Sequence, residues 1–406
     1  MKKFLKFLSM IGPGIFAIGY TIGTGSVTTM AKSGADYGLG LLWVLALSCL
    51  FSGVLMSAYG RFAAVTGETS LHGIIKFLPC GKLLAALVFI GVIMGQYTCL
   101  GGILTLSSGA IIEAFNLKIG VFPVACFLMV IMYSLLMVGR YGFFEKVLVF
   151  FVMVMALTFI FSVGVTFPDA VLLKKAIKPL IPNDGASFLI LAAFVGTTMA
   201  APTFVTRPLL IKEKNLTERD LKQEKIDSTI SAFMMFLISG AIIMVASSVL
   251  FANGKSIDKI LDMAQTLEPV AGNFAVLLFM LGTLSAGLSS VFPIMMVAPI
   301  LISDWRSGKM ETRTVSFRIL CLAAAAWGLV VPALGGNPII VTVMAQISNV
   351  FVLPVTIIAI MWLLNKKDVM GQHRAGIMMN TALFAALVFS IIIAFTGVVA
   401  LVKNFS

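Results

Sequence analysis

Long apolar stretches separated by short polar ones recur along the whole chain. About 20 apolar residues span the hydrocarbon core of a bilayer, and about eleven stretches reach that length. Irregular backbone in lipid leaves peptide groups without partners, so each stretch is predicted to be a helix. The expected spans are residues 11–31, 39–60, 83–112, 119–138, 146–167, 187–206, 229–252, 270–300, 315–333, 338–364 and 376–402.

Composition supports a membrane protein. Of 406 residues, 60% are hydrophobic and 11% are charged, with a mean hydropathy of +1.07, whereas a soluble domain needs more charge on its surface. We therefore expect one continuous transmembrane domain over residues 1–406. Five cysteines without CxxC spacing and two histidines in expected loops predict neither a disulfide framework nor a zinc site. No cofactor is expected.

The net charge of +12 follows from membrane topology rather than from nucleic-acid binding, because the basic residues are spread over short loops. Most of the 29 Lys and Arg residues fall in loops that are cytoplasmic if the N-terminus is cytoplasmic. The predicted location is the inner cell membrane, with the C-terminus outside, and we expect a monomer. The basic start of the chain lacks a small-residue cleavage site, so we expect it to be retained.

Acidic residues are expected only at the ends of spans or in loops. The most basic cytoplasmic segment, 207–227, alternates in charge and is interpreted as a solvated loop helix, with a regulatory role as the alternative. Charge within a span usually marks an ion or proton pathway. Without a His, Asp or Glu in mid-span, a hydrolytic enzyme is not expected.

Two spans carry helix-breaking residues near their middle. Span one contains Gly23-Thr24-Gly25-Ser26, and span six contains Gly196, Thr197, Thr198, Pro202 and Thr203. Glycine, hydroxyl residues and proline are poor helix formers, and proline removes a backbone donor. Broken helices at matching positions of two halves point to a transporter site at the interface of inverted repeats. Close packing of small residues between helices is the alternative.

Several segments in order and spacing resemble the Nramp family of divalent metal transporters over nearly the whole chain. They are Gly12-Pro13-Gly14, Ile18-Gly19-Tyr20, Leu41–Leu45, Val65-Thr66-Gly67, Phe144-Glu145-Lys146, Ala286–Ser290, and Gln346 with Pro354. The resemblance implies an all-α, polytopic, LeuT-type fold with discontinuous helices one and six. It also implies inverted repeats over roughly 11–167 and 187–364, with an extra helix at 376–402.

The sequence departs from the family at the metal site itself. The family's first break reads Asp-Pro-Gly-Asn, and alignment through Gly25 and Thr29 puts Gly23 and Ser26 at its two metal ligands. The family's Met-Pro-His in span six aligns with Ala201-Pro202-Thr203, although a neighbouring alignment puts Ala200 at the methionine. Gln346 keeps the family identity. Loss of the thioether removes a ligand that favours soft transition metals.

These departures leave two transporter hypotheses and one of another class. The first is alternating-access transport of a metal cation, for example hydrated Mg²⁺ held by Ser26, Thr203 and Gln346. The second is transport of a neutral or anionic small solute, because half-helix N-termini favour anions. The third is a receptor or structural subunit. The predicted site residues are Gly23, Thr24, Gly25, Ser26, Thr197, Thr198, Ala201, Pro202, Thr203 and Gln346.

Three further polar or soft side chains near the breaks have open roles. Met199 is expected to pack in the core rather than to bind a metal. Gln96 and Tyr97 in span three can face the cavity or form packing hydrogen bonds.

Overall fold

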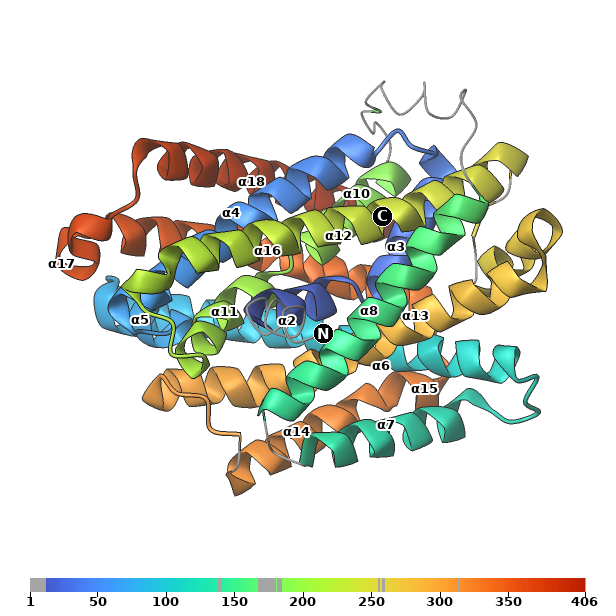
Figure 1. Ribbon diagram of the computed structural model, residues 1–406, viewed down its shortest axis with the longest axis horizontal. Coiled ribbons are helices and arrows are strands. Elements are labelled where there is room, and N and C mark those ends of the chain that lie inside the picture. The colour runs from blue at the N-terminus through green and yellow to red at the C-terminus, as the bar shows by residue number, and fades with distance from the viewer. Residues whose placement is uncertain are drawn as a thin grey trace.

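The computed structural model describes residues 12–137, 141–166, 180, 185–254, 256–257, 260–312 and 314–405, and nearly all of them are helical (Figure 1). The long helices are α2 Gly12–Thr21, α3 Thr24–Tyr37, α4 Leu42–Thr66, α6 Gly81–Ala114, α7 Val121–Met137, α8 Tyr141–Val165, α10 Gly185–Thr198, α11 Ala201–Glu213, α12 Leu221–Val249, α13 Ile260–Ser307, α14 Val315–Gly328, α16 Pro338–Asn365 and α18 Ile377–Phe405. Shorter elements are α5 Ser70–Phe77, α15 Val330–Leu334, α17 Lys367–Met370 and the 3₁₀ turns Glu218–Asp220, Phe251–Asn253 and Gly371–His373.

Nine helices within these residues are long and apolar enough to cross a membrane. Two more spans complete the set: the shorter apolar helix α7, and the first span, which is interrupted and consists of α2 and α3. The described residues thus contain eleven spans, the number predicted. The chain is therefore a multi-pass membrane protein. Several spans are longer than predicted; α12, for example, begins at Leu221, and α13 extends to Ser307.

The helices divide into an interior set and a peripheral set. In Ser187–Glu213, which covers α10 and α11, 89% of the most apolar stretch is buried, against 28% in Ile377–Val402 of α18. Large apolar side chains on α7, α14 and α18 are exposed, among them Phe127, Ile319 and Phe395. Such an apolar exterior suits lipid rather than water, so the sixth span lies at the centre.

Contacts around the interior set place the two interrupted spans together. α10 contacts α3 and α16, α11 contacts α2 and α4, and α12 contacts both α2 and α3. In Figure 1 the short helices α2, α3, α10 and α11 lie among the longer ones. The repeat boundaries 11–167 and 187–364 stay a prediction.

Candidate functional site

The first span is interrupted where its composition predicted. α2 ends at Thr21 and α3 begins at Thr24, and Gly23 between them is extended, with φ −98° and ψ −178°. Glycine loses the most conformational freedom in a helix, and threonine and serine hydroxyls compete for backbone partners. The run from Gly23 to Ser26 therefore begins a new helix instead of continuing the old one.

Backbone carbonyls at the end of α2 find partners on other helices. The hydroxyl of Ser290 on α13 donates to the Gly19 carbonyl at 2.6 Å, and the hydroxyl of Thr197 on α10 donates to the Thr21 carbonyl at 3.0 Å. An unpaired carbonyl in apolar surroundings is costly, so these bonds stabilise the break. The Thr197 bond also ties the sixth span directly to the first.

The sixth span is interrupted as well. α10 ends at Thr198, α11 begins at Ala201, and Ala200 is extended, with φ −63° and ψ 116°. Pro202 lies in the first turn of α11, where its missing N–H costs no helical hydrogen bond. The Thr198 carbonyl accepts a hydrogen bond from Ser52 on α4 at 2.8 Å. The prediction of two discontinuous helices is confirmed.

Both interrupted spans meet the tenth span at Gln346. A Cβ atom added to Gly25 would lie 3.3 Å from Gln346 Nε2 and 3.3 Å from Thr342 Cβ. A Cβ atom added to Gly196 would lie 2.0 Å from the Gln346 carbonyl oxygen. At Gly196 only glycine permits this approach, whereas at Gly25 a side chain would require its neighbours to shift by a few tenths of an ångström. Of the predicted residues, Gly25, Thr197 and Gln346 are thus brought to one place.

Three hydroxyls at the breaks are buried without a hydrogen-bond partner among the described residues. They belong to Thr24, Ser26 and Thr203, none more than 2% exposed. By contrast, Thr197 donates to the first break and Thr198 donates to the Phe194 carbonyl at 2.6 Å. Buried hydroxyls usually have partners. The unpaired ones are oxygens that a ligand at the breaks can use, and they include both hydroxyls predicted to face a metal.

α13 brings side chains to the first break that the sequence analysis did not select. A Cβ atom added to Gly287 would lie 2.1 Å from Ser107 Oγ and 3.0 Å from Thr24 Cγ2. A Cβ atom added to Gly23 would lie 2.5 Å from Ser290 Oγ. The small residues of Ala286–Ser290 were the available signal, but that segment entered the sequence analysis only through the family resemblance.

Span three contributes an amide to the region. Gln96 Nε2 donates to Asn349 Oδ1 at 3.2 Å. Of the two roles left open for Gln96, the structure therefore shows a packing hydrogen bond between helices. Tyr97 is half-buried against the main apolar cluster. Met199 lies inside that cluster, in line with a packing role. Asn349 was not among the predicted residues.

The interpretation of 207–227 as a solvated loop helix was wrong at the two ends of the segment, which are buried in helices, whereas its middle, including Glu218 and Arg219, is exposed. α11 continues to Glu213, and Arg207 is 1% exposed. Its guanidinium donates to Glu224 Oε1 at 3.0 Å, to Asp227 Oδ2 at 2.7 Å and to Ser228 Oγ at 2.9 Å. Both acids lie in the first two turns of α12, so they stand at the end of a span, where acidic residues were expected, but they are buried there. Mutual pairing makes the burial of these charges possible.

A third buried acid, on α13, stabilises a helix end. Asp304, expected at the end of span eight, accepts hydrogen bonds from the Thr69 hydroxyl and from the backbone N–H groups of Leu71 at 3.0 Å and His72 at 3.3 Å. These N–H groups open α5, and a carboxylate there satisfies otherwise free donors. His72 lies in this helix rather than in the predicted loop.

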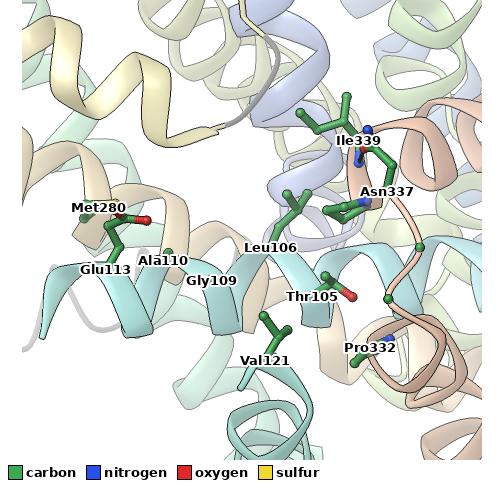
Figure 2. Close-up of a pocket in the computed structure, with 13 residues that line it drawn as sticks. Thr105, Leu106, Gly109, Ala110, Glu113, Val121, Met280, Pro332, Asn337 and Ile339 are labelled. Atoms are coloured by element: carbon green, nitrogen blue, oxygen red, sulfur yellow. Dashed lines mark hydrogen bonds between the residues drawn. The ribbon is translucent and has the colours of Figure 1, made fainter. Parts of the chain in front are cut away.

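A cavity of about 630 Å³ lies between the C-terminal part of α6 and the start of α16 (Figure 2). Thr105, Gly109 and Glu113 line it from α6, and Asn337 and Ile339 line it from the α16 side. Its described lining contains none of the predicted site residues. In the predicted topology this end of α6 faces outside the cell.

Within the described ranges, no group of three or more His, Cys, Asp or Glu side chains is placed to hold a metal ion. A metal at the breaks would therefore rely on hydroxyl, amide and carbonyl oxygens. Such ligands suit hard ions such as Mg²⁺ and Ca²⁺ better than soft transition metals.

Comparison with known proteins gives a family match over most of the chain. The model of the Nramp family, described as natural resistance-associated macrophage protein-like, matches residues 14–400. The divalent metal cation transporter MntH of Caldanaerobacter subterraneus subsp. tengcongensis is 24% identical over 395 residues, which cover 92% of this chain and 87% of that protein. The MntH of Clostridium acetobutylicum is 27% identical over 232 residues, so the match spans about half of each protein, 54% and 52%.

A solved structure shares the fold. The crystal structure of the Eremococcus coleocola manganese transporter has a TM-score of 0.75 at 16% identity and covers 97% of this chain and 86% of that one. Together with the two broken helices, this likeness confirms the predicted LeuT-type fold.

Proposed function

The chain belongs to the Nramp family, and from that premise we propose that it transports a divalent metal cation by alternating access, holding the ion with neutral oxygens. The relatives named divalent metal cation transporters support the class of substrate. The proposed site consists of the breaks and the turn of α16 that contacts them.

The observation that carries the proposal is a buried, unpaired hydroxyl in the first turn of the helix that follows each break. Ser26 lies in the first turn of α3 and Thr203 in the first turn of α11, and both oxygens are buried without a partner among the described residues. A buried hydroxyl left unpaired costs about 1–3 kcal/mol. The cost is offset when the hydroxyl oxygen binds a cation or a water molecule of its shell.

The ligand set favours Mg²⁺ over Mn²⁺ or Fe²⁺. Gly23 and Ala201 align with the family's carboxylate and thioether ligands, and neither has a side-chain atom that can coordinate a metal. Mg²⁺ dehydrates reluctantly and keeps several waters, so hydroxyls and amides can hold it through its shell. Without sulfur, transition metals lose the ligand that selects them.

Transport requires the site to open to one side at a time. Gly25 and Gly196 lie tightly against α16, so the half-helices must move relative to α16 before an ion can enter. Rocking or gating of one repeat or helix bundle against the other around a central site is the usual means in this kind of fold. We further propose the predicted topology, with the N-terminus in the cytoplasm.

Ion flux into proteoliposomes tests the proposal. Full-length protein should bring Mg²⁺ to an internal indicator dye, and Ser26→Ala or Thr203→Val should reduce the initial rate about tenfold, as expected for loss of a polar ligand. Ser247→Ala is the matched control, because Ser247 is also buried and unpaired among the described residues but lies on α12. Absence of divalent-ion binding at millimolar concentration would sink the proposal.

One observation favours the neutral or anionic solute as a second candidate. Gln346 turns its Nε2 end, a hydrogen-bond donor, toward Gly25 in this structure. A donor suits a carboxylate or carbonyl of a solute better than a cation. Calorimetry with amino and organic acids beside Mg²⁺ and Mn²⁺ separates the two: binding of an acid without any divalent ion supports this candidate.

A further inference from the structure

One turn of α16 is the meeting point of three other helices. A Cβ atom added to Gly25 of α3 would lie 3.3 Å from Gln346 Nε2, and one added to Gly95 of α6 would lie 3.0 Å from Asn349 Oδ1. Gly196 of α10 approaches the Gln346 carbonyl even more closely. The side chains on this turn are therefore held by backbone on three sides.

Three amides and a thiol form a hydrogen-bonded chain across this junction. Gln96 Nε2 donates to Asn349 Oδ1 at 3.2 Å, Asn349 Nδ2 donates to Gln346 Oε1 at 3.1 Å, and Gln346 Nε2 donates to Cys99 Sγ at 3.3 Å. All four side chains are at most 6% exposed. Gln96 and Cys99 on α6, and Gln346 and Asn349 on α16, are each three residues apart and so share a helix face.

The hydrogen-bonded chain has a direction, because the oxygen of each amide accepts hydrogen bonds and its NH₂ group donates them. Gln96 occupies the oxygen of Asn349 with a donor, so Asn349 can offer only its NH₂ group to Gln346. The oxygen of Gln346 is thereby occupied, and its NH₂ group is left to face Cys99 and Gly25. A cation at the first break would meet a donor rather than an oxygen.

We propose that Gln96 and Asn349 are positioning residues that fix which end of the Gln346 amide faces the first break, and so whether that site accepts a cation. The consequence for cations rests on the function proposed above. Both act through Gln346, because Asn349 donates to its amide oxygen and Gln96 holds Asn349.

The hydrogen-bonded chain can also run in the opposite direction. Turning the three amides over converts each bond into its reverse, with Gln346 donating to Asn349 and Asn349 donating to Gln96. The thiol of Cys99 can accept or donate a weak hydrogen bond, so it suits either direction. In the reversed chain the S–H group donates to Gln346 Oε1, and that oxygen faces Gly25. The direction depends on which end of Gln96 meets Asn349.

Gln96→Met tests the proposal without changing charge. Methionine is unbranched and of similar length, and its thioether is only a weak acceptor, so the donor that holds Asn349 Oδ1 is removed. The infrared S–H stretch of Cys99, assigned by subtraction of Cys99→Ala, reads the direction without any metal. It should move to lower frequency in Gln96→Met, because the thiol now donates to an oxygen.

Mg²⁺ affinity of the full-length protein in nanodiscs, measured by calorimetry, should rise about threefold to tenfold in Gln96→Met, the equivalent of one net hydrogen bond. In a Gln346→Leu background the same change should have no effect, because the group being oriented is gone. A purely structural role for Gln96 would instead lower affinity in both backgrounds. Gln96→Leu removes the donor without adding an acceptor and should give a smaller shift in the same direction, which serves if Gln96→Met does not fold.

The infrared and affinity measurements together support or overturn the inference. An S–H band at the same frequency in wild type and both variants overturns the inference, and so does a shifted band with lower Mg²⁺ affinity. A shifted band with no divalent-ion binding in any protein supports the positioning role of Gln96 and overturns the cation function instead.

Discussion

Arg207 and Asp227 form an ion pair inside the helical bundle: Arg207 Nη2 lies 2.7 Å from Asp227 Oδ2, with the two side chains 1% and 4% exposed. Glu224 accepts from the same guanidinium at 3.0 Å. The cluster joins α11, the second half of the broken sixth span, to α12. Because α12 also contacts α2 and α4, the cluster ties both interrupted spans to their surroundings.

Arg207→Met should destabilise the protein severely. The substitution leaves two buried carboxylates without their cation, and breaking a buried ion pair costs about 3–5 kcal/mol. The melting temperature in detergent, followed by size exclusion, measures the loss. The triple variant Arg207→Met, Glu224→Gln, Asp227→Asn should recover much of it, because no unpaired charge remains buried. Equal melting temperatures for the single and triple variants would contradict this account.

A glycine on α4 should be intolerant of any side chain because of this cluster. A Cβ atom added to Gly60 would lie 2.0 Å from Glu224 Oε1, and Arg207 holds that carboxylate in place. Gly60→Ala should therefore lower stability by about 1–3 kcal/mol through overpacking. The melting temperature again measures the effect.

Gly109→Ala provides the matched comparison. Gly109 lies within α6, and a Cβ atom there would meet nothing within 4 Å. Alanine restricts the unfolded chain more than glycine does, so stability should rise by up to about 1 kcal/mol. If both substitutions shift the melting temperature the same way, contact with Glu224 is not the cause of the Gly60 effect.

Local composition was sufficient to predict the spans and the breaks, because apolar length and helix-breaking residues act close to where they stand in the chain. The structure places Gly23 in the first break itself, and it places Gly25 and Pro202 in the first turns of the helices that follow the two breaks. Gln346 came from the family resemblance, not from any local signal.

Long-range pairing was not predictable from one sequence. Asn349 joins Gln96 across 253 residues, and Ser290 reaches Gly19 across 271. Arg207 looked solvated because it opens the segment 207–227, which alternates in charge, whereas its partners lie one helix later, on α12. A buried charge pair becomes visible only when packing brings its members together.

The topology predicts opposite labelling of two loop positions. Cys80 is exposed in the turn before α6, which the positive-inside rule places in the cytoplasm. A membrane-impermeant maleimide should leave Cys80 unlabelled in sealed right-side-out vesicles and label it after permeabilisation, with Cys80→Ser as the blank. Lys118→Cys in a Cys80→Ser chain, at the other end of α6, should label from outside. Labelling of Cys80 in sealed vesicles would reverse the orientation.

Restoring the family's ligands should create a Mn²⁺ site, provided that room is made for it. Gly23→Asp with Ala201→Met returns a carboxylate and a thioether to the breaks, ligands that together favour transition metals. A Cβ atom at Gly23 would lie 2.5 Å from Ser290 Oγ, so Ser290→Ala must accompany them. Calorimetry should show Mn²⁺ binding in this triple variant and about tenfold weaker binding when Asn replaces Asp, because the amide lacks the charge that compensates the ion. If the Asp and Asn variants bind Mn²⁺ equally, Gly23 does not occupy the place of the family's carboxylate.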